Sequence, residues 1–191
     1  MRLMLAHAAL ALFVVVRMYD TPGIPADTVA AARTTAVQIL RNANIDVRWR
    51  DCPCDRMVGP VELVMRLAVS TPESERGSLG FSYVDVQKRA GTLGTVFTDR
   101  VHALAQAARA DEGELLGRAM AHEIGHLLLG THDHARTGLM RGHWTSIELS
   151  KNQAPDWMLT SDDSVRIRQA LNIRIRQVRE ARVIAAMERR D

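Results

Sequence analysis

Five of the seven histidines lie close together, and two of them bracket a glutamate in the sequence His122-Glu123-Ile124-Gly125-His126. On an α-helix, residues four apart share one face, so the two imidazoles can reach one Zn²⁺ ion at about 2.0–2.1 Å. The glutamate between them can hydrogen-bond a metal-bound water, whose pKa the metal lowers toward ~7. The spacing therefore predicts hydrolytic chemistry, with His122 and His126 as metal ligands and Glu123 as general base.

The residues around this pentapeptide are mostly apolar, which predicts a buried or cleft position for it. Ionisable side chains without partners are costly in such a place, and a bound metal ion removes the cost. Three fixed letters in five residues also recur by chance, so the alternative is an exposed polar face of a structural helix. The apolar flank favours the metal site; it consists of Leu115, Leu116, Ala119, Met120, Leu127, Leu128 and Leu129.

The stretch from His122 onward resembles the metzincin metalloproteases, whose extended motif is HExxHxxGxxH followed by a Met-containing turn beneath the metal. Here Gly130 comes one position late, which leaves three candidates for the third ligand. His132 keeps the metzincin distance from His126, Asp133 keeps the distance from the displaced glycine, and His134 allows for a longer helix and a wider turn. Gly130 can end the helix with a positive φ and turn the chain toward the metal.

Residues 122–144 are also similar to a group of small uncharacterised bacterial proteins with a HEIGHLLLG stretch, in which an Asn-x-His follows the glycine. That resemblance favours His134 as the third ligand, and the metzincin resemblance implies that Met140 supports the site from below. We therefore expect one Zn²⁺ per chain, bound by His122, His126 and His134. His132 and Asp133 remain the alternatives.

The elements that must position these residues indicate an α+β domain. The predicted order is a strand, a helix and then several strands before the HExxH helix, which argues for a mixed twisted sheet rather than a doubly wound one. A polar turn at 87–91 makes the last two strands a hairpin at a sheet edge. Strands are predicted at 13–19, 45–49, 61–69, 79–86 and 92–101, and helices at 25–42, 111–130, from 145 and within the C-terminal helical segment 160–190.

The composition is that of an ordinary globular protein of 191 residues, with 47% hydrophobic and 25% charged residues. It excludes collagen-like, low-complexity and wholly disordered classes. The formal charge of +3 gives little support for a nucleic-acid partner, and the Arg-rich C-terminal helix is interpreted as a docked amphipathic helix with a solvated basic face.

The N-terminal run 3–16 is shorter than the ~20 residues of a membrane-spanning helix, so no membrane span is expected. We interpret residues 1–11 as a short or truncated signal segment and 12–191 as a single domain, which favours a secreted or periplasmic protein. If the run is only the first strand, the protein is cytoplasmic. Cys52 and Cys54 are either free thiols or a strained bridge, with a metal role as a distant third choice.

The leading hypothesis is a zinc-dependent peptidase in which Glu123 activates water. The metzincin resemblance implies that an extended peptide substrate adds to the sheet edge at 79–86. The alternative is a non-catalytic binding protein that keeps zinc as a structural element, and a weaker one is a basic binding module with an accidental HExxH.

Overall fold

The computed structural model describes residues 12–19, 23–52, 59, 61–74 and 77–187. The possible signal segment at 1–11 and Cys54 lie outside the described residues. Cys52 follows the second strand and is disulfide-bonded, so of the two alternatives left open by the sequence, a free thiol and a bridge, the structure has the bridge at this residue. Among the described residues, no helix is long and apolar enough to cross a membrane.

A five-stranded sheet forms one layer of the molecule, with the strand order β2-β1-β3-β5-β4. The first four strands in this order are parallel, and β4 pairs antiparallel with β5 at the edge. The mixed sheet and the α+β class are therefore confirmed. The strands are β1 (Leu12–Tyr19), β2 (Ile45–Asp51), β3 (Glu62–Ala68), β4 (Gly80–Asp85) and β5 (Ala90–Phe97).

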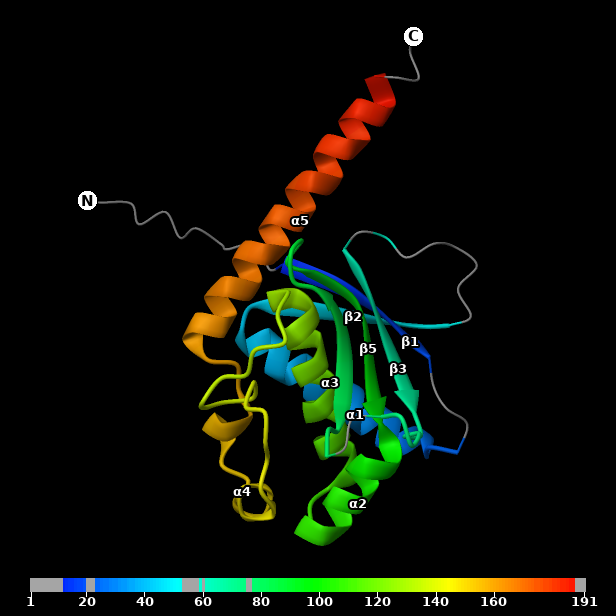
Figure 1. Cartoon of the computed structure of the whole chain (residues 1–191), viewed down its shortest axis with the longest axis vertical. Helices are drawn as coiled ribbons and strands as arrows, with labels where there is room; N and C mark the ends of the chain where they lie inside the picture. The colour runs from blue at the N-terminus through cyan, green and yellow to red at the C-terminus, as the bar shows by residue number, and fades with distance from the viewer. Residues whose placement is uncertain (1–11, 20–22, 53–58, 60, 75–76, 188–191) are drawn as a thin grey trace, which may run out of the picture.

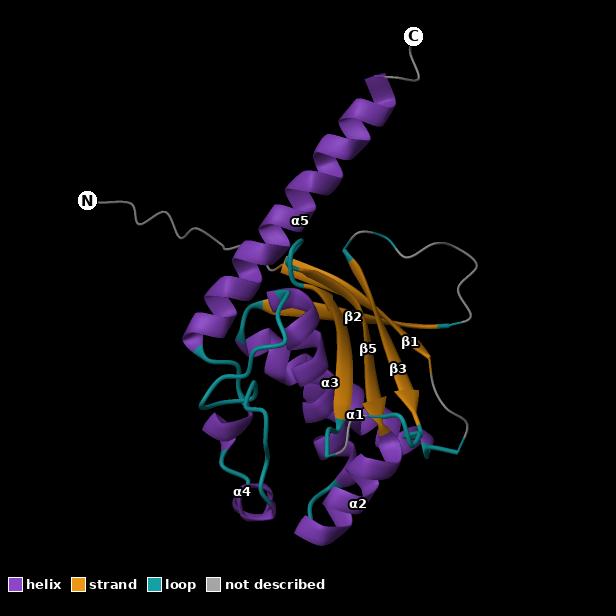
Figure 2. Cartoon of the chain, in the orientation of Figure 1, coloured by secondary structure: helices purple, strands orange, loops and turns teal. Residues whose placement is uncertain are grey.

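Two helices, α1 (Ala26–Asn42) and α3 (Glu112–Leu129), pack against each other and against the sheet (Figure 2). They approach closely because α3 presents glycine at the contact. A Cβ on Gly117 would lie only 2.5 Å from the carbonyl oxygen of Ala32. The core between these helices and the sheet contains Val16, Leu63, Met65, Ile124 and Leu127, all fully buried.

The predicted strand at 92–101 is too long, because the chain leaves the sheet at Phe97. Helix α2 (Thr98–Ala108) begins there, and Asp99 in its first turn accepts hydrogen bonds from the backbone N–H and the hydroxyl of Ser70. Val101, Ala105 and Ala108 are buried on one face of α2. This i, i+4, i+7 spacing is a helical signal. The predicted strand nevertheless continued to residue 101, because β-branched residues precede the helix.

The C-terminal part contains α4 (Ser146–Lys151), a 3₁₀ turn η1 (Ala154–Trp157) and the long helix α5 (Ser161–Met187). Ile167, Leu171 and Arg174 of α5 are buried against the body, and its last turns project beyond it (Figure 1). Arg176 and Arg179 are exposed, so the predicted amphipathic helix with a solvated basic face is confirmed for the docked part.

Candidate metal centre

Helix α3 carries the HExxH residues into the interior. Asp111 caps its start by accepting the backbone N–H of Glu114 at 2.7 Å, and Gly130 ends it with φ 66°. His122, Glu123 and His126 are 8%, 5% and 5% exposed, so the predicted buried environment is confirmed. The same helix faces β4 and β5 on one side and the loop that follows it on the other.

The imidazole rings of His122 and His126 meet edge to face, at 80° to each other, with their Nε2 atoms 3.0 Å apart. Each Nδ1 is occupied on the far side of the ring: that of His122 donates to the carbonyl oxygen of Leu139, and that of His126 to the carbonyl oxygen of Thr131, both at 2.9 Å. In a neutral ring whose Nδ1 carries the proton, Nε2 carries a lone pair. Two lone pairs therefore meet at 3.0 Å, which calls for a cation between them.

Burial also keeps both rings neutral. It lowers the pKa of His122 to about 3 and the pKa of His126 to about 4, because the charged form loses its water. A neutral imidazole with its other nitrogen bonded to a carbonyl is the form in which histidine binds metals. Two nitrogens bound tetrahedrally to one zinc ion at about 2.0–2.1 Å are about 3.3 Å apart, close to the separation found here.

His134 completes the group. One ring nitrogen from each of His122, His126 and His134 lies within 4.8 Å of the other two. The His134 ring passes over Gly142, where a Cβ would lie 3.0 Å from its Cγ, so a larger residue at 142 would displace the ring. His132 is exposed and does not belong to this group of donors among the described residues.

Asp133, the remaining alternative, is also exposed, and its backbone N–H bonds the hydroxyl of Thr131. The geometry thus brings together the three histidines predicted as ligands, and these three nitrogen donors suit Zn²⁺. Among the described residues only these three donors converge, and a tetrahedral ion held by them would have a fourth position open, as in hydrolytic zinc sites.

Met140 lies under α3, as the metzincin resemblance implies. It is 1% exposed, and a Cβ on Gly125 would lie 2.5 Å from its Sδ. Its backbone carbonyl accepts the N–H of Ala135 at 2.8 Å, which closes the loop between His134 and Met140. The backbone N–H of Leu139 donates to the carbonyl of Met158 at 2.8 Å and ties this turn to the segment before α5.

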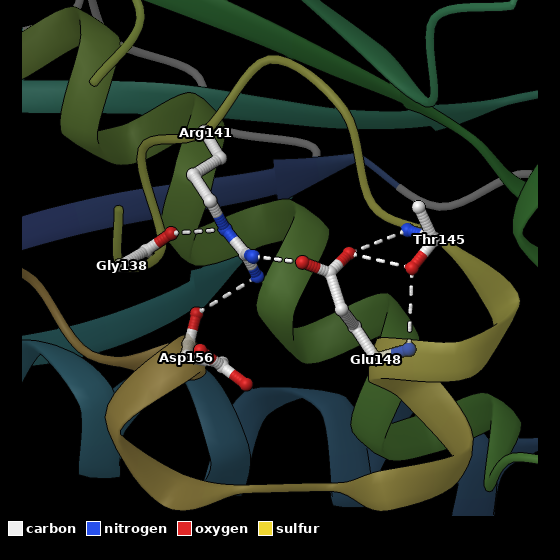
Figure 3. Close-up of polar contacts among 5 residues, drawn as sticks. All are labelled: Gly138, Arg141, Thr145, Glu148 and Asp156. Atoms are coloured by element: carbon white, nitrogen blue, oxygen red, sulfur yellow. Dashed lines mark hydrogen bonds and ion pairs between the residues drawn. The ribbon is translucent and has the colours of Figure 1, made fainter. Parts of the chain in front are cut away.

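Arg141 holds the turn from its other side (Figure 3). Its guanidinium pairs with Glu148 and donates to the backbone carbonyl of Gly138 at 3.1 Å. Glu148 is itself fixed by a capping box with Thr145, which confirms the helix start predicted there. The turn carrying Met140 is therefore braced against α4.

The side chain of Glu123 lies against β4 and lines the same cleft as the three histidines. The hydroxyl of Ser82 donates to its Oε2 at 2.6 Å, and burial raises the pKa of the carboxyl to about 7. Ser82 was not identified from the sequence. The alternation of the strand would have put the apolar Phe81 and Tyr83 inward and Ser82 outward, whereas the structure exposes both aromatic rings and buries Ser82, so no local signal pointed to it.

A cleft of about 920 Å³ opens above these residues, between β4, α2, α3 and the loop after α3. Trp144 forms part of its wall and meets the ring of His122 edge-on at 5.6 Å between centroids. His143 is exposed at the rim, and His102 does not line the cleft and pairs with Glu112. The other lining residues include Leu79, Gly80, Ser82, Arg100, Leu104, Ala119, His132 and Gly142.

No protein-family model matches this sequence, and no curated protein matches it. Solved structures resemble it in fold. The archaemetzincin from Methanopyrus kandleri superposes with a TM-score of 0.54 at 13% identity, over 88% of this chain and 99% of that one. Metalloproteinase-II from Bacteroides fragilis superposes with a TM-score of 0.52 at 13% identity, over 86% of this chain and 55% of that one. The chain thus spans about half the length of the second neighbour and has the fold seen in both.

Proposed function

We propose that the protein is a zinc-dependent peptidase. The observation that carries the proposal is the convergence of three imidazole nitrogens within 4.8 Å of one another, beside a buried glutamate at the floor of a cleft. The two structural neighbours agree with it, since one is an archaemetzincin and the other a metalloproteinase. A secreted or periplasmic location remains part of the proposal.

The three histidines and Glu123 have different roles in the proposed reaction. His122, His126 and His134 would hold the zinc, which when bound supplies a Lewis acid and lowers the pKa of water. Glu123 accepts the proton of the attacking water and returns it to the leaving amine. The contact with Ser82 holds the carboxylate at the cleft, where it can reach a water in the position left open by the three histidines.

The edge of β4 is the proposed site for an extended peptide. The backbone N–H of Phe97 donates to the carbonyl of Leu79, so the alternation of an antiparallel pair turns the backbone groups of Gly80 and Ser82 away from β5. These groups lie at the cleft, where a substrate strand can bond them. Ser78 contacts Gly80 from the same edge and would yield its place to the substrate.

The metal content tests the centre. Untagged protein purified without added zinc or chelator should contain about one zinc per chain. His134→Ala should lose the metal and His132→Ala should keep it, because only His134 belongs to the group of donors. A parent that takes up no metal even when zinc is offered would overturn the proposal.

The cleavage of an unfolded protein separates catalysis from a structural zinc site. The zinc-loaded parent should cleave fluorescently labelled, denatured casein, and Glu123→Gln should bind zinc normally but cleave it at least 100-fold more slowly. Cleavage by Glu123→Gln at the parental rate would show that Glu123 is not the base. A parent that binds zinc and cleaves nothing would instead favour the non-catalytic binding protein.

A further inference from the structure

The Glu123 side chain lies in a cradle made by three residues of the edge hairpin. Gly80 and Ser82 are two apart on β4 and therefore face the same side of the sheet, toward α3. Gly94 of β5 is the register partner of Ser82, so it lies beside the serine on the same side. A Cβ on Gly94 would be 3.3 Å from the Cβ of Glu123.

The two carboxylate oxygens of Glu123 have different surroundings in this cradle. Oε2 accepts the Ser82 hydroxyl at 2.6 Å, and the same hydroxyl is 3.1 Å from the backbone carbonyl oxygen of Glu123. Oε1 lies over Gly80, where a Cβ would be only 2.4 Å away. One oxygen is therefore held by the strand, and the other occupies a space that exists because residue 80 has no side chain.

This asymmetry matters for a general base. A carboxylate with two equivalent oxygens can rotate about its last torsion, which is a broad and soft one. A hydrogen bond to one oxygen restricts that rotation and leaves the other oxygen for the proton that moves. Ser82 is also 3% exposed, so its hydroxyl has no water to bond in place of Glu123.

We propose that Ser82 is a positioning residue for the general base. Its hydroxyl fixes Oε2 and thereby presents Oε1 to the attacking water, with Gly80 providing the space. The inference rests on the proposed function, since it assigns the orientation of the base in that reaction. Strand β4 would then orient Glu123 through Ser82 in addition to binding the substrate through its backbone.

Four variants test the proposal by activity. Ser82→Ala should lower kcat on denatured casein roughly ten- to hundred-fold, the range expected for losing a hydrogen bond to a charged group, with KM within about two-fold of the parent. Ser82→Thr restores the hydroxyl and should recover most of the loss, whereas Ser82→Val, which has the shape of threonine, should not. Thr92→Ala is the matched control, because Thr92 is an exposed hydroxyl residue of β5, and it should leave kcat unchanged.

A double-mutant cycle of unfolding measurements tests the contact between Ser82 and Glu123 independently of catalytic activity. With zinc occupancy measured for each variant, Ser82→Ala should lower the urea midpoint in the parent and lower it less in a Glu123→Ala background, where the acceptor is gone. Equal losses in both backgrounds would show that the hydroxyl does not act through Glu123. Equal kcat for Ser82→Ala and the parent, or for the Thr and Val variants, would also overturn the proposal.

The failure of this inference is distinct from the failure of the proposed function. If Glu123→Gln abolishes cleavage and Ser82→Ala does not reduce it, only the positioning role is wrong. If Glu123→Gln cleaves as fast as the parent, the proposed mechanism itself is wrong. In that case the positioning role fails with it, even where the double-mutant cycle shows that the two side chains touch.

Discussion

The thioether of Met140 occupies the space in which a side chain on Gly125 would begin, since a Cβ there would lie 2.5 Å from the sulfur. Gly125 precedes the proposed ligand His126 on α3, so the methionine contacts the helix next to the group of three histidines. Both residues belong to the core, and neither can change size without the other responding.

Gly125→Ala should therefore destabilise the protein although alanine favours helix. The helix propensity gained is about 1 kcal/mol, and overpacking a core costs about 1–3 kcal/mol. In a Met140→Ala background the clash is gone, so the same substitution should raise the free energy of unfolding by about 1 kcal/mol. Urea denaturation of the four proteins measures the change in free energy of unfolding in each background. If Gly125→Ala changes it in the same direction in both, the packing of Met140 on Gly125 is contradicted.

Removal of zinc should lower the thermal midpoint. A metal that binds only the folded chain stabilises it by about 4 kcal/mol at 1,000 times its Kd, and each kcal/mol shifts the midpoint of a chain of this size by about 2–4 °C. We expect thermal scans with excess zinc and with chelator to differ by roughly 8–16 °C for the parent. The difference should vanish for His122→Ala, and its persistence there would place the metal elsewhere.

Arg141 should stabilise the turn that carries Met140. Its side chain is 13% exposed, and it bonds Glu148 and the carbonyl of Gly138 at once (Figure 3). We expect Arg141→Ala to cost about 1–3 kcal/mol, and Arg141→Lys to recover only part, because an ammonium group lacks the planar fork. Arg136→Ala is the control, since Arg136 is exposed in the same loop and should change stability by less than about 0.5 kcal/mol.

Arg174 should fasten α5 to the body. Its guanidinium is buried and donates to the carbonyl of Leu127 at 2.5 Å and to that of Gly91 at 3.3 Å. Leu127 lies in the last turn of α3, where carbonyls have no partner within the helix and attract cations.

Arg174→Ala is therefore expected to cost about 1.5–3 kcal/mol and to open α5 to proteolysis, whereas Arg176→Ala, an exposed neighbour on the same helix, should do neither. Limited proteolysis followed by mass spectrometry locates the cuts. If both variants are cut alike, α5 is held by its apolar contacts alone.

Much of the fold could be predicted because its signals are local. Alternating apolar residues marked the strands, Pro25 marked the start of α1, and Gly130 marked the end of α3. The boundary at Phe97 could not be placed this way, because β-branched residues run on into Val101 and the helix start depends on Asp99 meeting Ser70, which is 29 residues away in sequence. The secondary-structure propensities of single residues carry no information about such a long-range contact.

The histidines and Glu123 could be identified because HExxH is a local motif whose spacing has a mechanical meaning. The choice of His134 depended on a resemblance, since spacing alone left His132 and Asp133 open. Ser82 could not be connected to Glu123, because 41 residues of sequence, including β5 and α2, separate them. A pairing of this kind arises only when the hairpin and α3 meet.

Strand β4 is hydrogen-bonded to the sheet on one side only, through β5, and its inward face packs against α3. Side chains alternate along a strand, and a slip of one residue would exchange its two faces. Phe81 would then turn its ring toward Glu123, while Ser82 would turn toward solvent. A one-residue insertion or deletion in the turn at 86–89 that shifts this register should therefore abolish activity, although every residue of the site is unchanged.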